Sequence, residues 1–213
     1  MKPSSQQSTQ PVVIKLGGSL LHSPYLQHWL TAISEHGKGR AVIVPGGGEY
    51  ADKVRIAQKT QGFDAIEAHR RAIQAMQRMA TDYIQLVPAL TLAESLTNIK
   101  AGLQQNNVPI AMPIDAWLNA KAIPASWDWT SDSLALWLGD KLQIDRLLLV
   151  KAVEPDSSKI QAQQAADKGL VDAAFPNLLA NTQVSVFLAA QQKFSFLPSW
   201  LNEQADNPFQ KFI

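Results

Sequence analysis

The chain has 213 residues, of which 46% are hydrophobic, so it is long enough to bury the core of a single α/β domain. Its 19 basic and 18 acidic side chains give a formal net charge of +1, which argues against a broad charged surface for nucleic acid or an anionic membrane. The absence of cysteine excludes disulfides, thiolate catalysis and metals bound by cysteine.

The N-terminal segment is polar and has no apolar core like that of a signal peptide. We expect a disordered tail over residues 1–11 and one domain over residues 12–213. No apolar stretch approaches the roughly 20 residues that a helix needs to cross a bilayer, so the sequence favours a cytoplasmic protein.

The first part of the domain repeats a unit of strand, turn and helix. Apolar β-type runs at residues 12–16 and 41–45 are each followed by glycines. Apolar residues at helical spacing predict a helix from Pro24 to about His36 and a second that ends near Gly62. Asp64 is a candidate N-cap for a long helix that continues to Tyr83.

The second part continues the alternation. A helix is predicted from Leu92 to about Gln105, then a strand over residues 108–112 and an irregular segment rich in tryptophan. Ser131 and Asp132 open another helix, and residues 146–150 form the continuous apolar run of a buried central strand. A short helix at 175–180, a strand at 184–188 and an edge strand within 209–213 complete an α/β fold with a mostly parallel sheet covered on both faces.

The two glycine turns, Gly17-Gly18-Ser19 and Gly46-Gly47-Gly48, are candidate phosphate-binding loops. Glycine lets backbone N–H groups approach an anion without interference from Cβ, and a helix that starts just afterwards adds the positive end of its dipole. Any turn between a strand and a helix can carry glycine. Two such turns, one of them with Lys15 inside its strand, favour phosphate binding.

Lys15 is the leading catalytic candidate, because phosphoryl transfer depends on positioning and on neutralising the charge of the transferred group. The alternative, a solvent-facing strand lysine, is disfavoured by the glycines that follow at once. Asp132 could orient a lysine, assist magnesium coordination or simply cap its helix. Glu49 could contact a substrate or be an ordinary acidic residue of a first helical turn.

Four further cationic or titratable residues could bind an anionic substrate or lie as solvated helix residues: Arg55, His69, Arg70 and Arg71. The tryptophans around the Asp132 motif favour core packing, although one or two could wall a pocket for an aromatic ring: Trp117, Trp127, Trp129 and Trp137. The four histidines show no metal-ligand spacing, so a structural zinc site is not expected.

Three motifs in their order, Lys15-Leu16-Gly17-Gly18-Ser19, Pro45-Gly46-Gly47-Gly48-Glu49 and Thr130-Ser131-Asp132-Ser133, resemble the amino acid kinase superfamily. The resemblance implies a three-layer α-β-α sandwich and a kinase that uses ATP and Mg²⁺. It also implies that Asp132 organises the catalytic lysines. The implied nucleotide site is Lys15, Gly17, Gly18, Ser19 and Lys151, and the implied acceptor site is Gly46, Gly47, Gly48, Glu49, Arg55 and Ser131.

A narrower resemblance, carried by residues 45–51, 126–134 and 169–176, is to the short kinases of methanofuran biosynthesis. Those kinases convert an aminomethylfuran methyl phosphate to its diphosphate, so this resemblance makes that small phosphate the expected acceptor. The resemblance also implies a homodimer that assembles through a helix face.

The chain departs from the superfamily pattern in two places. Residues 150–155 read Val-Lys-Ala-Val-Glu-Pro where many relatives read Thr-Asp-Val-Asp-Gly, and the segment that carries a second phosphate lysine is missing. Lys151, Lys159 and Lys168 are the candidates to replace that lysine.

Two alternatives stay open at this point: a kinase for another acceptor, such as uridylate, isopentenyl phosphate or an amino acid, and a binding subunit with a kinase fold but no catalysis. A dinucleotide-dependent oxidoreductase is disfavoured, because neither glycine turn reads Gly-x-Gly-x-x-Gly.

Overall fold

The computed structural model describes residues 10–153, 159–203 and 207–213. Most of the expected tail over residues 1–11 lies outside the described residues, as do Glu154 and Pro155 of the unusual 150–155 segment. The strands within the described residues are β1 (Val12–Leu16), β2 (Ala41–Pro45), β3 (Thr91–Ala93), β4 (Pro109–Ala111), β5 (Arg146–Lys151), β6 (Lys159–Ile160), β7 (Ser185–Ala190) and β8 (Gln210–Phe212).

The helices that connect these strands vary from single turns to six turns. The α-helices are α1 (Pro24–His36), α2 (Gly48–Gln61), α3 (Ala65–Leu86), α4 (Leu96–Gln104), α5 (Ile114–Asn119), α6 (Ser131–Leu142), α7 (Ala162–Asp167), α8 (Phe175–Ala180) and α9 (Leu197–Leu201). Two 3₁₀ segments, η1 (Gly18–Leu20) and η2 (Gln191–Phe196), follow β1 and β7.

All the described strands belong to one sheet, with the order β3-β4-β2-β1-β5-β7-β8-β6. Each neighbouring pair is parallel except β7 and β8, which run antiparallel. Strands β2, β3 and β4 lie on one side of β1, and β5 and the later strands lie on its other side. The loops after β1, β2 and β5 therefore lie together at the carboxyl ends of the strands, where α/β proteins commonly bind ligands.

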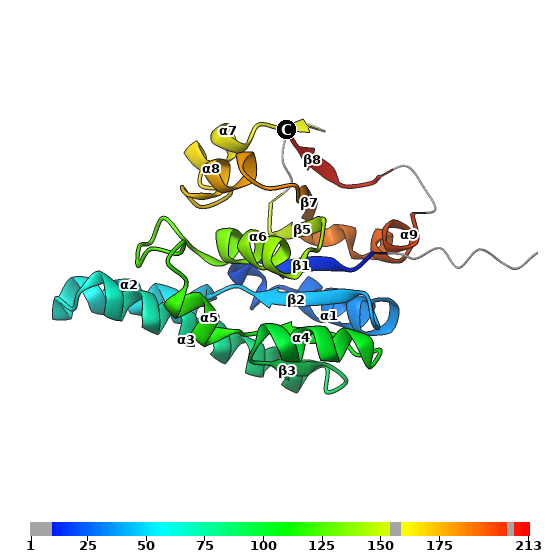
Figure 1. The fold of residues 1–213 in the computed structure, drawn as a ribbon, viewed down its shortest axis with the longest axis horizontal. Helices are drawn as coiled ribbons and strands as arrows, with labels where there is room; N and C mark the ends of the chain where they lie inside the picture. Colours follow the sequence, from blue (N-terminus) through cyan, green and yellow to red (C-terminus); the bar gives the residue numbers. More distant parts are fainter. Residues whose placement is uncertain (1–9, 154–158, 204–206) are drawn as a thin grey trace, which may run out of the picture.

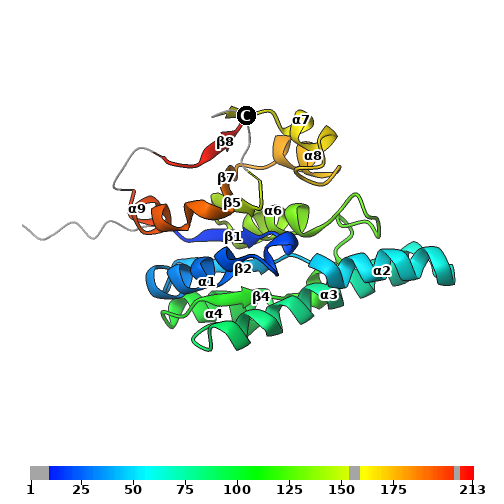
Figure 2. The same cartoon turned by 180° about the vertical axis from the view of Figure 1, so that it is seen from behind.

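Helices cover both faces of the sheet. Figures 1 and 2, seen from opposite sides, show α4 and α6 in front of the sheet in one view, and α1 and α3 in front of it in the other. Helix α2 contacts α3, buries no residue completely and extends past the end of the sheet. The result is the expected α/β fold, with three layers and a mostly parallel sheet.

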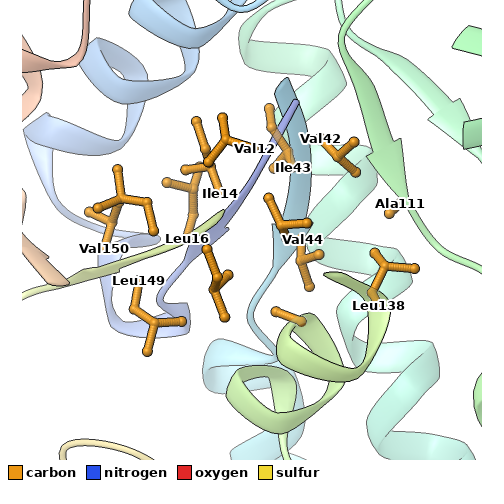
Figure 3. Packing of buried hydrophobic residues seen from close by; sticks show 14 of the residues in the cluster. Val12, Ile14, Leu16, Val42, Ile43, Val44, Ala111, Leu138, Leu149 and Val150 are labelled. Atoms are coloured by element: carbon orange, nitrogen blue, oxygen red, sulfur yellow. The ribbon is translucent and has the colours of Figure 1, made fainter. Parts of the chain in front are cut away.

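The centre of the core is formed by β1, β2 and β5, whose side chains are buried on both faces. Figure 3 shows Ile14 and Leu16 of β1 beside Val44 of β2, with Leu138 of α6 packed nearby. These residues are 0% exposed. A strand that is buried on both faces has to be apolar, and this is why residues 147–150 of β5 form one continuous apolar run, with the partly buried Arg146 before it.

Most of the predicted elements are confirmed, but one helix boundary and the position of one strand were wrong. Leu92 does not start a helix: it lies in β3, and α4 begins after Ser95, whose hydroxyl accepts a hydrogen bond from the Asn98 N–H. Strand β8 is not at the edge, because β6 pairs with its outer side. The tryptophan-rich segment also contains a short helix, α5, that the sequence pattern did not indicate.

Candidate active site

The two glycine turns lie against each other at the edge of the sheet where β1 and β2 end. A Cβ atom on Gly18 would lie 2.5 Å from the Cα of Gly48, and one on Gly46 would lie 2.8 Å from the Cα of Gly18. Gly48 also has a φ of +50°, which side chains rarely allow. Backbone packing therefore requires glycine at these positions, and the two turns lie side by side.

Strand register brings two lysines to the same face of the sheet. Lys15 of β1 is the partner of Leu149 in β5. Side chains alternate between faces along a strand, so Lys151, two residues after Leu149, points to the same side as Lys15. That side is the one covered by α6, whose first turn contains Asp132.

Asp132 binds both lysines. Its Oδ1 lies 2.7 Å from the Lys15 Nζ, and its Oδ2 accepts a hydrogen bond of 2.7 Å from the Lys151 Nζ. Burial alone would raise the pKa of Asp132, but the adjacent charges of Lys15 and Lys151 outweigh burial and lower this pKa to about 2. Asp132 is thus ionised at neutral pH and pairs with both ammonium groups.

Lys151 is affected in the opposite direction. Burial is the main cause that lowers its pKa to about 8; the charge of Lys15 acts in the same direction, and the attraction of Asp132 limits the shift. With both lysines charged, the cluster of Lys15, Asp132 and Lys151 has one net positive charge. This net charge favours an additional anion beside the cluster.

Asp172 fixes the start of α6 from a distant part of the chain. Its carboxylate accepts hydrogen bonds from the N–H and hydroxyl groups of Thr130 and Ser133, and from the Phe175 N–H. Burial and the charge of Asp132 raise the pKa of Asp172, while the hydrogen bonds from Ser133 and Thr130 limit this rise. The carboxylate of another segment thus takes the place of a side-chain N-cap on α6.

A cavity of about 260 Å³ opens over this cluster and is bordered by the two glycine turns. Several of the residues singled out by the sequence line it: Lys15, Gly18, Ser19, Gly47, Gly48, Arg55, His69, Trp127, Trp129, Ser131, Asp132 and Lys151. The cavity thus brings together cations, backbone N–H groups at the start of α2, and aromatic surface. Asp52, Ile73 and Met76 also line it and were not predicted.

Other candidates lie elsewhere. Gly17 and Gly46 take part in the backbone of the turns rather than in the lining, and the Gly17 N–H donates to the Val150 carbonyl. Glu49 lies outside the lining and faces Lys53 and His22 on the surface. Arg70 and Arg71 both pair with Glu67 of their own helix.

The cavity lining also distinguishes among the lysine candidates and the tryptophans. Lys159 and Lys168 do not line the cavity, so within the described residues Lys151 is the candidate that the fold places beside Lys15. Trp117 and Trp137 are buried in the core, as core packing predicts.

Asp172 was missed as a site residue because 39 residues separate it from Ser133. Its local sequence gives no sign of that contact.

The described residues contain no group of three His, Asp or Glu side chains arranged to hold a metal ion. Within the same ranges, no helix combines the length and the hydropathy of a membrane span.

Comparison with known proteins supports a kinase. The model of the amino acid kinase family matches residues 10–155. The [5-(aminomethyl)furan-3-yl]methyl phosphate kinase of Methanocaldococcus jannaschii is 28% identical over 187 residues, covering 83% of this chain and 86% of that protein.

Two solved structures have a similar fold. The uridylate kinase of Archaeoglobus fulgidus has a TM-score of 0.70 at 14% identity and covers 96% of this chain and 100% of its own. The isopentenyl phosphate kinase of T. acidophilum has a TM-score of 0.60 at 11% identity and covers the same shares of the two chains.

The fold and the cluster of cations beside two glycine turns define a phosphotransferase. The chain belongs to the amino acid kinase family. Membership of this family implies that the protein uses a nucleotide.

Proposed function

We propose that the protein transfers the γ-phosphoryl group of ATP to the phosphate of a small phosphorylated acceptor, and that this acceptor is [5-(aminomethyl)furan-3-yl]methyl phosphate. The observation that carries the proposal is the cluster in which Asp132 holds Lys15 and Lys151 at the opening of the two glycine turns. The relative from Methanocaldococcus jannaschii supports the choice of acceptor, because its name states that substrate.

The cluster suits a reaction between two phosphates. Both reactants are anionic, so electrostatic repulsion is the main obstacle to bringing them together. Lys15 and Lys151 offset this repulsion and stabilise the charge that develops on the transferred group. Asp132 keeps the two ammonium groups within reach of one phosphoryl group and positions them before the substrates bind.

A general base is not needed for this reaction. The second pKa of a phosphate monoester is about 6, so most of the acceptor already has a doubly ionised phosphate at neutral pH. One of its oxygens attacks the γ-phosphorus, the bond from that phosphorus to the β-γ bridging oxygen breaks, and ADP leaves with the electron pair. Asp132 could not serve as a base in any case, because its pKa of about 2 makes it a very weak one.

In this proposal each glycine turn binds the phosphate of a different substrate. We assign the turn of Gly17, Gly18 and Ser19, with Lys15 and Lys151, to the ATP phosphates. We assign the turn of Gly46, Gly47 and Gly48, with Arg55 and Ser131, to the acceptor phosphate. The N-terminus of α2 follows the second turn directly and favours an anion there.

Mg²⁺ is part of the proposal only as a companion of ATP. Both oxygens of Asp132 are occupied by lysines, and the described residues hold no group of three candidate ligands. The residues that the structure describes therefore do not form a magnesium site, and no step is assigned to the ion.

The test is to incubate the purified protein with ATP, Mg²⁺ and the aminomethylfuran monophosphate and to identify the product by mass. A diphosphate product supports both the reaction and the acceptor. Parallel reactions with uridylate, isopentenyl phosphate and aspartate test the alternative acceptors. If none is phosphorylated and calorimetry detects no binding of an ATP analogue, the proposal is wrong and the alternative of a subunit without catalysis is favoured.

A further inference from the structure

A second cavity, of about 220 Å³, lies next to the first on the side of α3. The two cavities share His69, Ala72, Trp127 and Trp129 in their walls. None of Lys15, Asp132 and Lys151 lines the second cavity, so it lies away from the reacting phosphates. The rest of its lining consists of Ala65, Ala68, Ala125 and Ser126.

The shape of this second cavity follows from its small residues. Ala65, Ala68 and Ala72 repeat every three to four positions along α3 and therefore lie on one face of the helix. Their methyl groups leave open space in front of the helix. The indoles of Trp127 and Trp129 bound this space, so it is lined by alanine and by aromatic rings.

Trp127 is held in place by helix α2. Its Nε1 donates a hydrogen bond of 2.8 Å to the Gln58 Oε1, and the Arg55 guanidinium lies 4.3 Å from the ring centroid. Two contacts from the same helix fix both the edge and one face of the indole. The aromatic wall is thus formed before any ligand binds, which lowers the entropic cost of binding.

His69 is a polar side chain in this largely apolar wall. Its side chain lies between the two cavities, the residue is only 8% exposed, and its Nε2 has no hydrogen-bond partner among the described residues. Burial lowers the pKa of His69, so the imidazole is neutral at physiological pH. A buried polar atom without a partner is unfavourable, and a ligand that supplies the missing hydrogen bond recovers that loss.

We infer that the second cavity binds the end of the acceptor opposite its phosphate, as a flat ring beside the two tryptophans with an amine substituent that donates a hydrogen bond to His69. This inference rests on the proposed phosphoryl transfer and names the part of the acceptor that the site selects. The aromatic faces contribute twice, because they stack with a ring and attract a cationic amine.

The same wall disfavours the other acceptors. An isopentenyl chain offers no hydrogen bond and leaves the His69 Nε2 without a partner. A nucleobase presents several donors and acceptors on its edge, whereas this cavity offers few partners for them. The Ser126 hydroxyl already donates to Asp128 and accepts from the Asp128 N–H, and the Trp127 Nε1 already donates to Gln58.

The test compares two ligands that differ only in the amine: [5-(aminomethyl)furan-3-yl]methyl phosphate and (5-methylfuran-3-yl)methyl phosphate. Their binding to the full chain is measured by calorimetry without ATP, so the result does not depend on turnover. We expect the wild type to prefer the amine by tenfold or more. His69→Leu should bind both ligands equally, and His69→Gln, which keeps a hydrogen-bonding group, should recover part of the preference. His36→Leu, at an exposed histidine on α1, is the matched control and should bind as the wild type does.

A second variant tests the aromatic wall. Trp127→Phe should weaken binding of both furan phosphates by a similar factor and leave the affinity for an ATP analogue unchanged. The inference is overturned if the wild type binds neither furan phosphate, if it shows no preference for the amine, or if His69→Leu retains that preference.

Turnover is measured separately with the same proteins. Binding with the amine preference but no diphosphate product would contradict the proposed function and leave the ring site supported. If the diphosphate forms but His69→Leu keeps the preference for the amine, the proposed function is supported and the ring site is contradicted.

Discussion

Asp172 accepts two hydrogen bonds from Ser133, one from its main-chain N–H and one from its hydroxyl, although 39 residues separate the two positions. Ser133 directly follows Asp132, so this contact fixes the turn that presents Asp132 to the lysines. The geometry of the cluster therefore depends on a loop that itself contributes no group to the cavity lining.

Asp172→Asn should reduce both stability and turnover. The substitution keeps one acceptor oxygen but places an NH₂ group against donors of Thr130 or Ser133. We expect a loss of about 1–3 kcal/mol in the free energy of unfolding, as for a buried donor that loses its partner. Denaturant titration measures this loss, and kcat should also fall because Asp132 is less well positioned. Asp140→Asn, at an exposed position on the same helix, is the control, and equal effects of the two changes would argue against the positioning role.

Lys15→Ala should leave the fold intact and remove most of the turnover. Loss of one group that stabilises transition-state charge commonly lowers kcat by about 10²–10³. Lys151 remains to neutralise Asp132, so no unpaired carboxylate is left. Steady-state kinetics with a melting curve separate the two effects. Lys53→Ala, at an exposed lysine of α2, serves as the control, and an unchanged kcat in Lys15→Ala would exclude Lys15 from the mechanism.

Gly18→Ala should destabilise the protein and weaken nucleotide binding together. The added methyl group meets the backbone of Gly48, which cannot move without displacing the second turn. We expect a cost of about 1–3 kcal/mol, as in other overpacked sites. In contrast, Gly102→Ala lies in helix α4, where a Cβ atom would make ordinary contact with Pro109 at 3.4 Å. It should raise stability by up to about 1 kcal/mol through helix propensity. Similar denaturation midpoints for the two variants would contradict this account of the turns.

Local pattern was enough to predict most of the fold. Asp64 was predicted to cap the long helix, and its carboxylate does accept a hydrogen bond of 2.8 Å from the Glu67 N–H in the first turn of α3. Such signals act over a few residues, so they can be read directly from the chain. Strand β3 was missed for the same reason: only three residues long, it is defined by its pairing with β4, and its own apolar pattern suits a helix equally well.

The site was predictable only in part. Lys15, the glycines and Asp132 stand out because each lies at the end of a strand or the start of a helix. The choice of Lys151 over Lys159 and Lys168 required the register between β1 and β5, which no local pattern contains. His69 was singled out as a possible anion binder, but its surroundings of alanine and tryptophan come from the packing of α3 against the 120–130 loop.

The pH dependence of kcat/KM should report the loss of the positive charge of Lys151. Its lowered pKa of about 8 means that this lysine loses its charge as the pH rises above 8, whereas an ordinary lysine stays charged to about pH 10. We therefore expect kcat/KM to fall by tenfold for each pH unit above about 8. Lys151→Arg should remove this decline, because guanidinium remains charged throughout the range.

Unfolding does not explain the same decline, and the sign of the linkage shows why. Between about pH 8 and pH 10.5, the unfolded chain holds a proton on Lys151 that the folded protein has lost, so the contribution of this residue to stability increases with pH. Melting curves from pH 7 to pH 10 should therefore show no loss of stability that depends on Lys151. A kcat/KM that stays constant to pH 10 in the wild type, or a decline that persists in Lys151→Arg, would mean that the charge of Lys151 does not support the transfer.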